Sequence, residues 1–137
     1  MTRDEIIESA NRRCGFNIHN GLKLRDFDDS KCVMEVRLTE ASLNPRGMAH
    51  GGLVFSLCDT AAGVLAALMG KSCVTLSADI RFLHPSCGEY LYCVASMIKG
   101  SGRVLVADTK VYDDRDRLTA SATVELFVLG DGEKREE

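Results

Sequence analysis

The 137-residue sequence has no tryptophan, only two prolines and no charge-free apolar run long enough to suggest a membrane span. Its longest apolar stretch, residues 53–69, is interrupted by Asp59 and bounded by glycines, which argues against a transmembrane helix. No basic block interleaved with aromatic residues is present, and 17 basic against 20 acidic residues give a formal charge of -3. A nucleic-acid partner is therefore not expected.

The six cysteines include no C-x-x-C pair, and no secretory segment precedes them. This pattern favours reduced thiols in a cytoplasmic protein over a disulfide scaffold. Cys32, Cys73 and Cys93 fall in strand-like runs, where a free cysteine behaves as a small core hydrophobe. We therefore expect no metal site, no cofactor and no catalysis by a thiol.

Residues 50–70 begin with a histidine and two glycines and then place apolar side chains on nearly every helical face. This pattern predicts a helix that protein surrounds on all sides. Its one charge, Asp59, is costly to remove from water unless it is paired or hydrogen-bonded. Polar and small residues recur at helical spacing along one stripe: Ser56, Asp59, Thr60 and Gly63. The stripe predicts a cavity, although Asp59 could instead accept hydrogen bonds in a purely structural role.

Gly51 and Gly52 leave bare N–H groups at the positive end of this predicted helix, where an oxyanion can bind. The two glycines could equally serve only a tight turn. Gly51 and Asp59 are eight residues apart, which is roughly 12 Å along a helix that rises about 1.5 Å per residue. They cannot contact one atom within one subunit. A two-fold dimer with antiparallel helices would bring them together in two shared sites.

The remaining segments fit one α+β domain over residues 1–137, because a chain of this length forms one core. In the run after the central helix, alternation places Val74 and Ile80 on one face and Thr75 and Ser77 on the other. A hairpin, one helix and four antiparallel strands predict a sheet that curls around the helix. The expected elements are a helix within residues 1–15, a hairpin at 22–38, strands at 74–82, 90–98, 104–112 and 118–129, and a frayed tail at 130–137.

Several short motifs occur in a fixed order along the chain: Leu43-Asn44, His50-Gly51-Gly52, Leu57, Asp59 and Ala61, and Phe82-Leu83-His84-Pro85. Over residues 26–129 this order resembles the phenylacetic-acid-degradation (PaaI-like) hotdog thioesterases. The resemblance implies a hotdog fold, in which an antiparallel sheet wraps around one long central helix. It also implies hydrolysis of acyl-CoA thioesters by a homodimer whose sheets join edge to edge, often paired into a homotetramer.

The same resemblance implies roles for individual residues. Asp59 matches the catalytic carboxylate, and Gly51 matches the backbone donor to the thioester carbonyl. His50 and Asn44 match flanking positions that help to orient the substrate. Ser77 matches a strand serine that helps to position water in some relatives.

Gly52 is expected to bind the substrate, and the CoA nucleotide is expected on the surface near the strand ends. There Lys99 and Arg103 flank one turn, and His84 begins another loop. Asp59 could attack the carbonyl directly or remove a proton from water. Two other functions stay open, namely a hotdog hydratase or dehydratase that acts on the acyl chain, and a non-catalytic acyl-CoA-binding protein.

Overall fold

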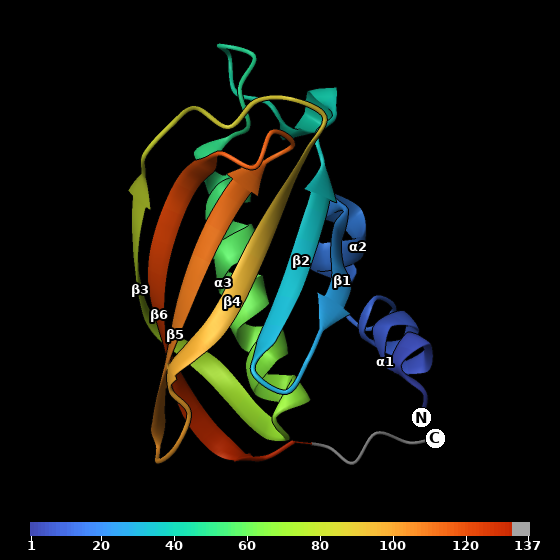
Figure 1. Ribbon diagram of the computed structural model, residues 1–137, viewed down its shortest axis with the longest axis vertical. Helices are drawn as coiled ribbons and strands as arrows, with labels where there is room; N and C mark the ends of the chain where they lie inside the picture. Colours follow the sequence, from blue (N-terminus) through green and yellow to red (C-terminus); the bar gives the residue numbers. More distant parts are fainter. Residues whose placement is uncertain (133–137) are drawn as a thin grey trace.

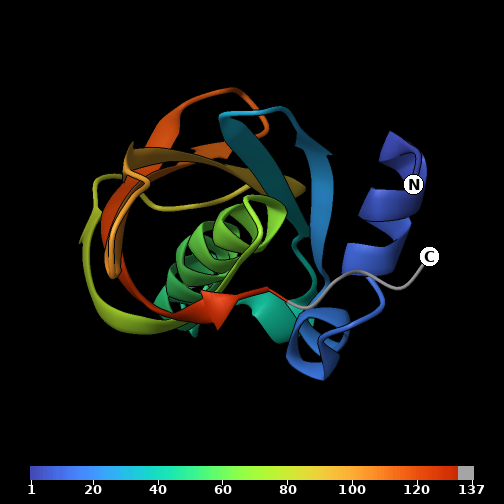
Figure 2. The same cartoon turned by 90° about the horizontal axis from the view of Figure 1, so that it is seen from below.

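The long apolar segment forms helix α3 (Gly51–Leu68), whose N-cap is His50. The computed structural model, which describes residues 1–132, places α3 inside a strongly curved sheet (Figures 1 and 2). By length and hydropathy α3 is apolar enough to cross a membrane, but here it contacts all six strands. Its apolar surface therefore forms the protein core. The buried residues of α3 are Val54, Leu57, Cys58, Ala61, Ala62, Leu65 and Ala66.

Six antiparallel strands form one sheet in the order β1-β2-β4-β5-β6-β3. This arrangement confirms the predicted fold, an antiparallel sheet around one long helix. The last strand continues to Asp131, so Gly130 lies in a strand rather than in the expected tail, and residues 133–137 lie outside the described residues. The strands are β1 (Leu22–Phe27), β2 (Lys31–Arg37), β3 (Lys71–Phe82), β4 (Tyr90–Lys99), β5 (Val104–Asp113) and β6 (Leu118–Asp131).

The N-terminal segment forms two short helices, α1 (Arg3–Ala10) and α2 (Gly15–Asn20), rather than the single helix expected within residues 1–15. Helix α1 ends early because the side chain of Asn11 pairs with β1. Its Oδ1 accepts from the N–H of Leu24 at 2.7 Å, and its Nδ2 donates to the carbonyl of Leu24 at 3.0 Å. Both helices lie beside β1 and cover that edge of the sheet (Figure 1).

Strand β3 forms the other edge of the sheet, and a bulge interrupts its alternation. Thr75 pairs with Leu126 and Ser77 pairs with Glu125, so Leu76 is an extra residue between them. Directly opposed residues of antiparallel strands share a face. Since Leu126 is buried in the core beneath α3, Thr75 faces the helix and Ser77 faces away. The prediction that put both on one face is wrong, because a bulge leaves no clear mark in the sequence.

A short 3-10 turn, η1 (Glu40–Ser42), and an irregular loop connect β2 to α3. The loop returns on itself, because the N–H of Asn44 donates to the carbonyl of Met48 at 2.7 Å and Leu43 bridges to Ala49. Gly47 turns the chain with a φ of +77°, a conformation that suits glycine. This loop delivers His50 to the start of α3 at one end of the sheet (Figure 1).

Candidate active site

Asp59 is the only charged residue of α3, and strand β3 holds its carboxylate. The hydroxyl of Thr75 donates to Oδ1 of Asp59 at 2.6 Å. Within residues 1–132 no second hydrogen bond to this half-buried carboxylate is found. One oxygen is therefore fixed, while the other is available to accept a proton or to attack an electrophile.

Thr75 was not among the site residues expected from the sequence. Ser77, which was expected, lies two residues further along β3, on the face away from α3 and opposite Glu125. A plain count of alternating residues assigns Thr75 to that outer face as well, so only the bulge reveals the contact with Asp59. The stripe of helical polar residues was the one available signal that Asp59 needs a partner.

The start of α3 presents one free backbone donor. Nδ1 of His50 accepts from the N–H of Gly52 at 2.8 Å, as an N-cap side chain does. Within residues 1–132 no acceptor for the N–H of Gly51 is found. Of the two glycine N–H groups, only that of Gly51 is therefore available to a ligand. Because Nδ1 of His50 is an acceptor, the neutral ring carries its proton on Nε2 and can donate from there.

Gly51 lies in a hollow of about 340 Å³ that Asn44 and His84 also line. Oδ1 of Asn44 accepts from the N–H of Arg46 at 2.9 Å and from that of Met48 at 3.1 Å, so this side chain shapes its own loop. The structure thus brings three of the expected residues, Asn44, Gly51 and His84, to one place.

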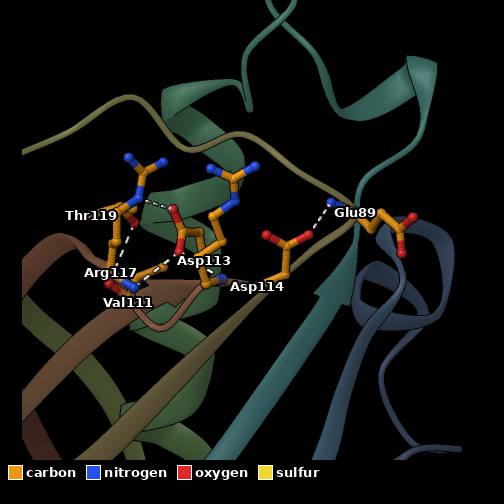
Figure 3. Close-up of polar contacts among 7 residues, drawn as sticks. Glu89, Val111, Asp113, Asp114, Arg117 and Thr119 are labelled. Atoms are coloured by element: carbon orange, nitrogen blue, oxygen red, sulfur yellow. Dashed lines mark hydrogen bonds and ion pairs between the residues drawn. The ribbon is translucent and has the colours of Figure 1, made fainter.

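The loop that carries His84 is fixed at one end to the start of β6 and at the other end to the turn between β5 and β6. The carbonyl of Thr119 accepts from the N–H groups of Leu83 and His84, at 2.8 and 3.1 Å. At the far end of the loop, the N–H of Glu89 donates to Oδ2 of Asp114 at 2.8 Å (Figure 3). The wall of the hollow opposite Gly51 is therefore held in place by hydrogen bonds to the start of β6 and to the side chain of Asp114.

The β5–β6 turn is itself organised by Asp113, whose side chain is only 1% exposed. Its carboxylate accepts from the N–H groups of Arg115 and Arg117, both at 3.0 Å, and from Nε of Arg117 at 2.9 Å (Figure 3). Burial alone would raise the pKa of Asp113, but the hydrogen bonds from Arg117 and Arg115 outweigh it and hold that pKa below its ordinary value. The ionised carboxylate therefore stabilises this turn.

Lys99 and Arg103 lie at the other end of the sheet, because β4 runs its full length between Lys99 and the loop of His84 (Figure 1). Nζ of Lys99 donates to the carbonyls of Ser101 and Val104, at 2.9 and 3.0 Å. The guanidinium of Arg103 donates to the carbonyl of Val128 at 3.2 Å. Within one subunit the structure does not bring these two cations near His84 or Gly51.

Cys32, Cys58 and Cys93 are buried in the core between α3 and the sheet. Burial raises the pKa of the Cys32 thiol to about 12, and this thiol donates to the carbonyl of Ala61 at 3.3 Å. A hydrogen bond with Cys58, together with burial, raises the pKa of Cys93 well above its ordinary value. Thiols that stay protonated are poor nucleophiles, so Cys32 and Cys93 act as core residues. The hydrogen bond with Cys93 lowers the pKa of Cys58, but the Cys58 side chain is buried in the core.

Comparison with known proteins gives consistent matches. Residues 46–120 match the thioesterase superfamily. Acyl-coenzyme A thioesterase PaaI of Escherichia coli K12 is 28% identical over 107 residues, which cover 78% of this chain and 74% of that protein. The solved structure of that E. coli protein matches with a TM-score of 0.86 at 21% identity over 95% of each chain.

A Streptococcus mutans UA159 protein, solved with bound acetyl CoA, matches at 27% identity with a TM-score of 0.77, over 82% of this chain and 91% of the other. The superfamily match covers more than half of the chain and includes His50, Gly51 and Asp59. The chain belongs to the thioesterase superfamily, as a PaaI-like protein with the hotdog fold.

Proposed function

We propose that this protein hydrolyses acyl-CoA thioesters to free CoA and a carboxylic acid, with Asp59 as the reacting carboxylate. The main support is the environment of Asp59, the sole charge of α3, which Thr75 holds by one oxygen and leaves open at the other. The substrate class is supported by the similar S. mutans protein that binds acetyl CoA and by a Streptococcus pneumoniae TIGR4 thioesterase solved with coenzyme A.

The S. pneumoniae thioesterase also supports the pairing of the two side chains. It has been solved as two variants. One replaces an aspartate by alanine, and the other replaces a threonine that lies sixteen positions after that aspartate. Asp59 and Thr75 have the same separation in this chain. We infer that Thr75 positions the carboxylate for reaction.

The chemistry requires an ionised carboxylate near the thioester carbonyl carbon. Asp59 either attacks that carbon and forms a mixed anhydride that water then hydrolyses, or takes a proton from a water molecule that attacks it. In both routes the C–S bond breaks, and the CoA thiolate leaves and takes up a proton. The charge that develops on the carbonyl oxygen is stabilised by the N–H of Gly51 at the positive end of a helix.

The donor and the carboxylate must come from different subunits. Gly51 and Asp59 lie in the same helix, roughly 12 Å apart along its axis at about 1.5 Å per residue. We propose a homodimer in which the β3 edges of two copies pair, so that the two α3 helices run antiparallel and each Gly51 approaches the Asp59 of the other copy.

The free edge of β3 supports this assembly. Within residues 1–132 β3 pairs only with β6, and Val74, Leu76 and Phe82 are 50%, 56% and 57% exposed. A long edge strand with exposed apolar side chains is a template for pairing with another strand. Dimers of this kind can associate further into the tetramer that the resemblance implies.

The experiment that tests the function is a panel of acyl-CoAs with detection of the free thiol. Hydrolysis releases one thiol per substrate, whereas a hydratase or dehydratase changes the acyl chain without releasing thiol, and a binding protein does neither. The variant Asp59→Asn should lose at least about a hundredfold in kcat, as expected for loss of a general base. The matched control is Asp29→Asn, an exposed carboxylate in the turn between β1 and β2, away from the β3 edge. Near-normal turnover by a folded Asp59→Asn protein would contradict the assignment.

A further inference from the structure

A second cavity, of about 460 Å³, lies on the other side of Asp59 from the start of α3. Its walls come from the second half of α3, from the beginning of β3, from α1, α2 and the segment that joins them, and from Gly132. Its volume falls within the range of about 300–1,000 Å³ that is usual for small-molecule sites. The lining residues that matter here are Thr60, Gly63, Val64, Ala67 and Cys73.

This cavity begins about one helical turn from Asp59 on α3 and two residues from Thr75 on β3. Gly63 follows Asp59 by four residues, so it lies on the same helix face about 6 Å further along the axis. Cys73 precedes Thr75 by two residues on the helix-facing side of β3, about 7 Å along the strand. A group attached to a carbonyl at Asp59 can therefore enter the cavity without a bend around α3.

Gly63 keeps space open in the floor of the cavity. A Cβ added at this position would meet no atom within 4 Å, so no contact within the subunit requires a glycine. Glycine in the middle of a helix is destabilising relative to alanine. The packing of α3 within the subunit therefore does not account for a glycine at this position.

The chemistry of the walls suits an acyl group better than the CoA arm. On the α3 side the cavity is lined by uncharged residues, and only Thr60 among them is polar. The remaining polar and charged lining residues belong to the N-terminal segment and to the start of β3: Ser9, Arg13, Asn17, Lys71 and Ser72. The amides of the pantetheine arm would lose hydrogen bonds to water against Gly63, Val64 and Ala67. A hydrocarbon chain has no such requirement, and its burial is favourable.

We propose that this cavity is the acyl-binding pocket, that it selects apolar acyl groups considerably longer than acetyl, and that Gly63 sets the usable length. The inference rests on the proposed hydrolysis of acyl-CoA and adds the substrate class. The substitution Gly63→Leu would fill the cavity one helical turn from Asp59. The substitution Ala67→Leu would fill it one turn further along α3.

The test measures kcat/KM for acetyl-, hexanoyl- and decanoyl-CoA with wild-type protein, Gly63→Ala, Gly63→Leu and Ala67→Leu. Gly63→Leu should lower the ratio of decanoyl to acetyl turnover by about tenfold or more, since a few methylene groups are worth that much in a filled pocket. Gly63→Ala should act in the same direction but less, and Ala67→Leu should affect decanoyl more than hexanoyl. Gly15→Leu is the matched control, because Gly15 also has open space but lies outside the cavity.

Inhibition by free CoA separates the acyl group from the CoA arm, and should be the same in Gly63→Leu and wild type. An unchanged decanoyl-to-acetyl ratio in both folded leucine variants would overturn the proposal. An equal loss of kcat/KM for all three substrates, together with weaker inhibition by CoA, would also overturn it. So would dissociation of the dimer in the leucine variants with no change in the decanoyl-to-acetyl ratio. Each of these results leaves the proposed hydrolysis standing, whereas a wild-type protein that releases no thiol from any acyl-CoA overturns both.

Discussion

At the scale of single residues, the contact between Asp59 and Thr75 is the feature on which the proposed chemistry depends. The bond of 2.6 Å fixes one carboxylate oxygen in an otherwise apolar helix. Loss of this donor leaves the carboxylate free to rotate away from the substrate carbonyl, and a displacement of about 1 Å can cost a hundredfold in rate. Thr75 is therefore a positioning residue rather than a reacting group.

Thr75→Val should lower kcat by between about tenfold and a hundredfold, because it removes the hydroxyl but keeps the branched shape of the side chain. KM should change little. Thr75→Ser restores the donor and should recover most of the rate, which a merely structural role of the methyl group would not produce. Steady-state kinetics of both variants, with the fold checked by circular dichroism, measures this. Equal activity of the valine and serine variants would remove Thr75 from the site.

Much of the candidate site could be predicted at this scale, because an isolated charge and a pair of glycines can be recognised in the amino-acid sequence alone. Asp59 and Gly51 are of this kind. The availability of the Gly51 N–H was not predictable, since it depends on His50 capping Gly52 instead. Nor was Thr75, because the bulge at Leu76 reverses the face that alternation assigns to it.

At the scale of elements, the start of α3 combines a structural cap with a free donor. Gly51 is the first helical residue after the N-cap, a position whose N–H has no partner within the helix. Proline is well tolerated there, and His50 has a ψ of 136°, in the extended range that a residue before proline prefers. A proline at position 51 therefore removes the N–H without breaking the helix.

Gly51→Pro should lower kcat by about a hundredfold or more, as found when one oxyanion donor is lost. Gly51→Ala keeps the N–H and is the control. Its Cβ would lie 3.5 Å from the ring of Phe82, an ordinary contact, so this variant should keep most of the activity. Turnover and helix content of both proteins provide the measurement. Similar losses in the two variants would indicate crowding rather than a missing donor.

The β5–β6 turn gives a prediction about stability and pH. The pKa of Asp113 is lowered in the folded state, so its ionised form stabilises the folded protein. This contribution to the free energy of unfolding is complete above the unfolded pKa of about 3.9. It is lost as the pH falls through the lower, folded pKa. Asp113→Asn should therefore lower stability by about 1–2 kcal/mol at pH 7, and less as the pH drops below about 4.

Thermal unfolding between pH 3 and pH 7 measures the difference between wild type and Asp113→Asn. Asp29→Asn, in the exposed turn between β1 and β2, is the control and should leave the curve unchanged. A destabilisation by Asp113→Asn that stays constant at all these pH values would assign the effect to packing instead of charge.

The elements themselves were predictable where a pattern extends over many residues, as in α3 and the β4–β6 meander. The N-terminal segment was not, because α1 ends where the side chain of Asn11 binds Leu24, a residue thirteen positions away. Helix α2 has only six residues, too few for a clear helical period.

At the scale of the whole molecule, one geometric fact links the fold to the assembly. The helix that carries both Asp59 and Gly51 keeps them roughly 12 Å apart along its axis at about 1.5 Å per residue. The sequence already predicts this separation, whereas the identity of the free sheet edge required the structure. The side chain of Asn11 and the two N-terminal helices cover β1, so within residues 1–132 β3 is the edge available to a second copy.

The shared site can be tested by mixing two inactive proteins, one with Asp59→Asn and the other with Gly51→Pro. Each homodimer is damaged in both of its sites. In a heterodimer with sites shared between chains, one site contains both changes and the other contains neither, so activity should return to about half of the wild-type value per dimer. If each site instead used Asp59 and Gly51 of the same chain, every site would keep one lesion and the mixture would stay inactive. Differently tagged chains, purified as verified heterodimers, allow the measurement. Inactive heterodimers of two folded variants would exclude the shared arrangement, and with it the requirement for a dimer in catalysis.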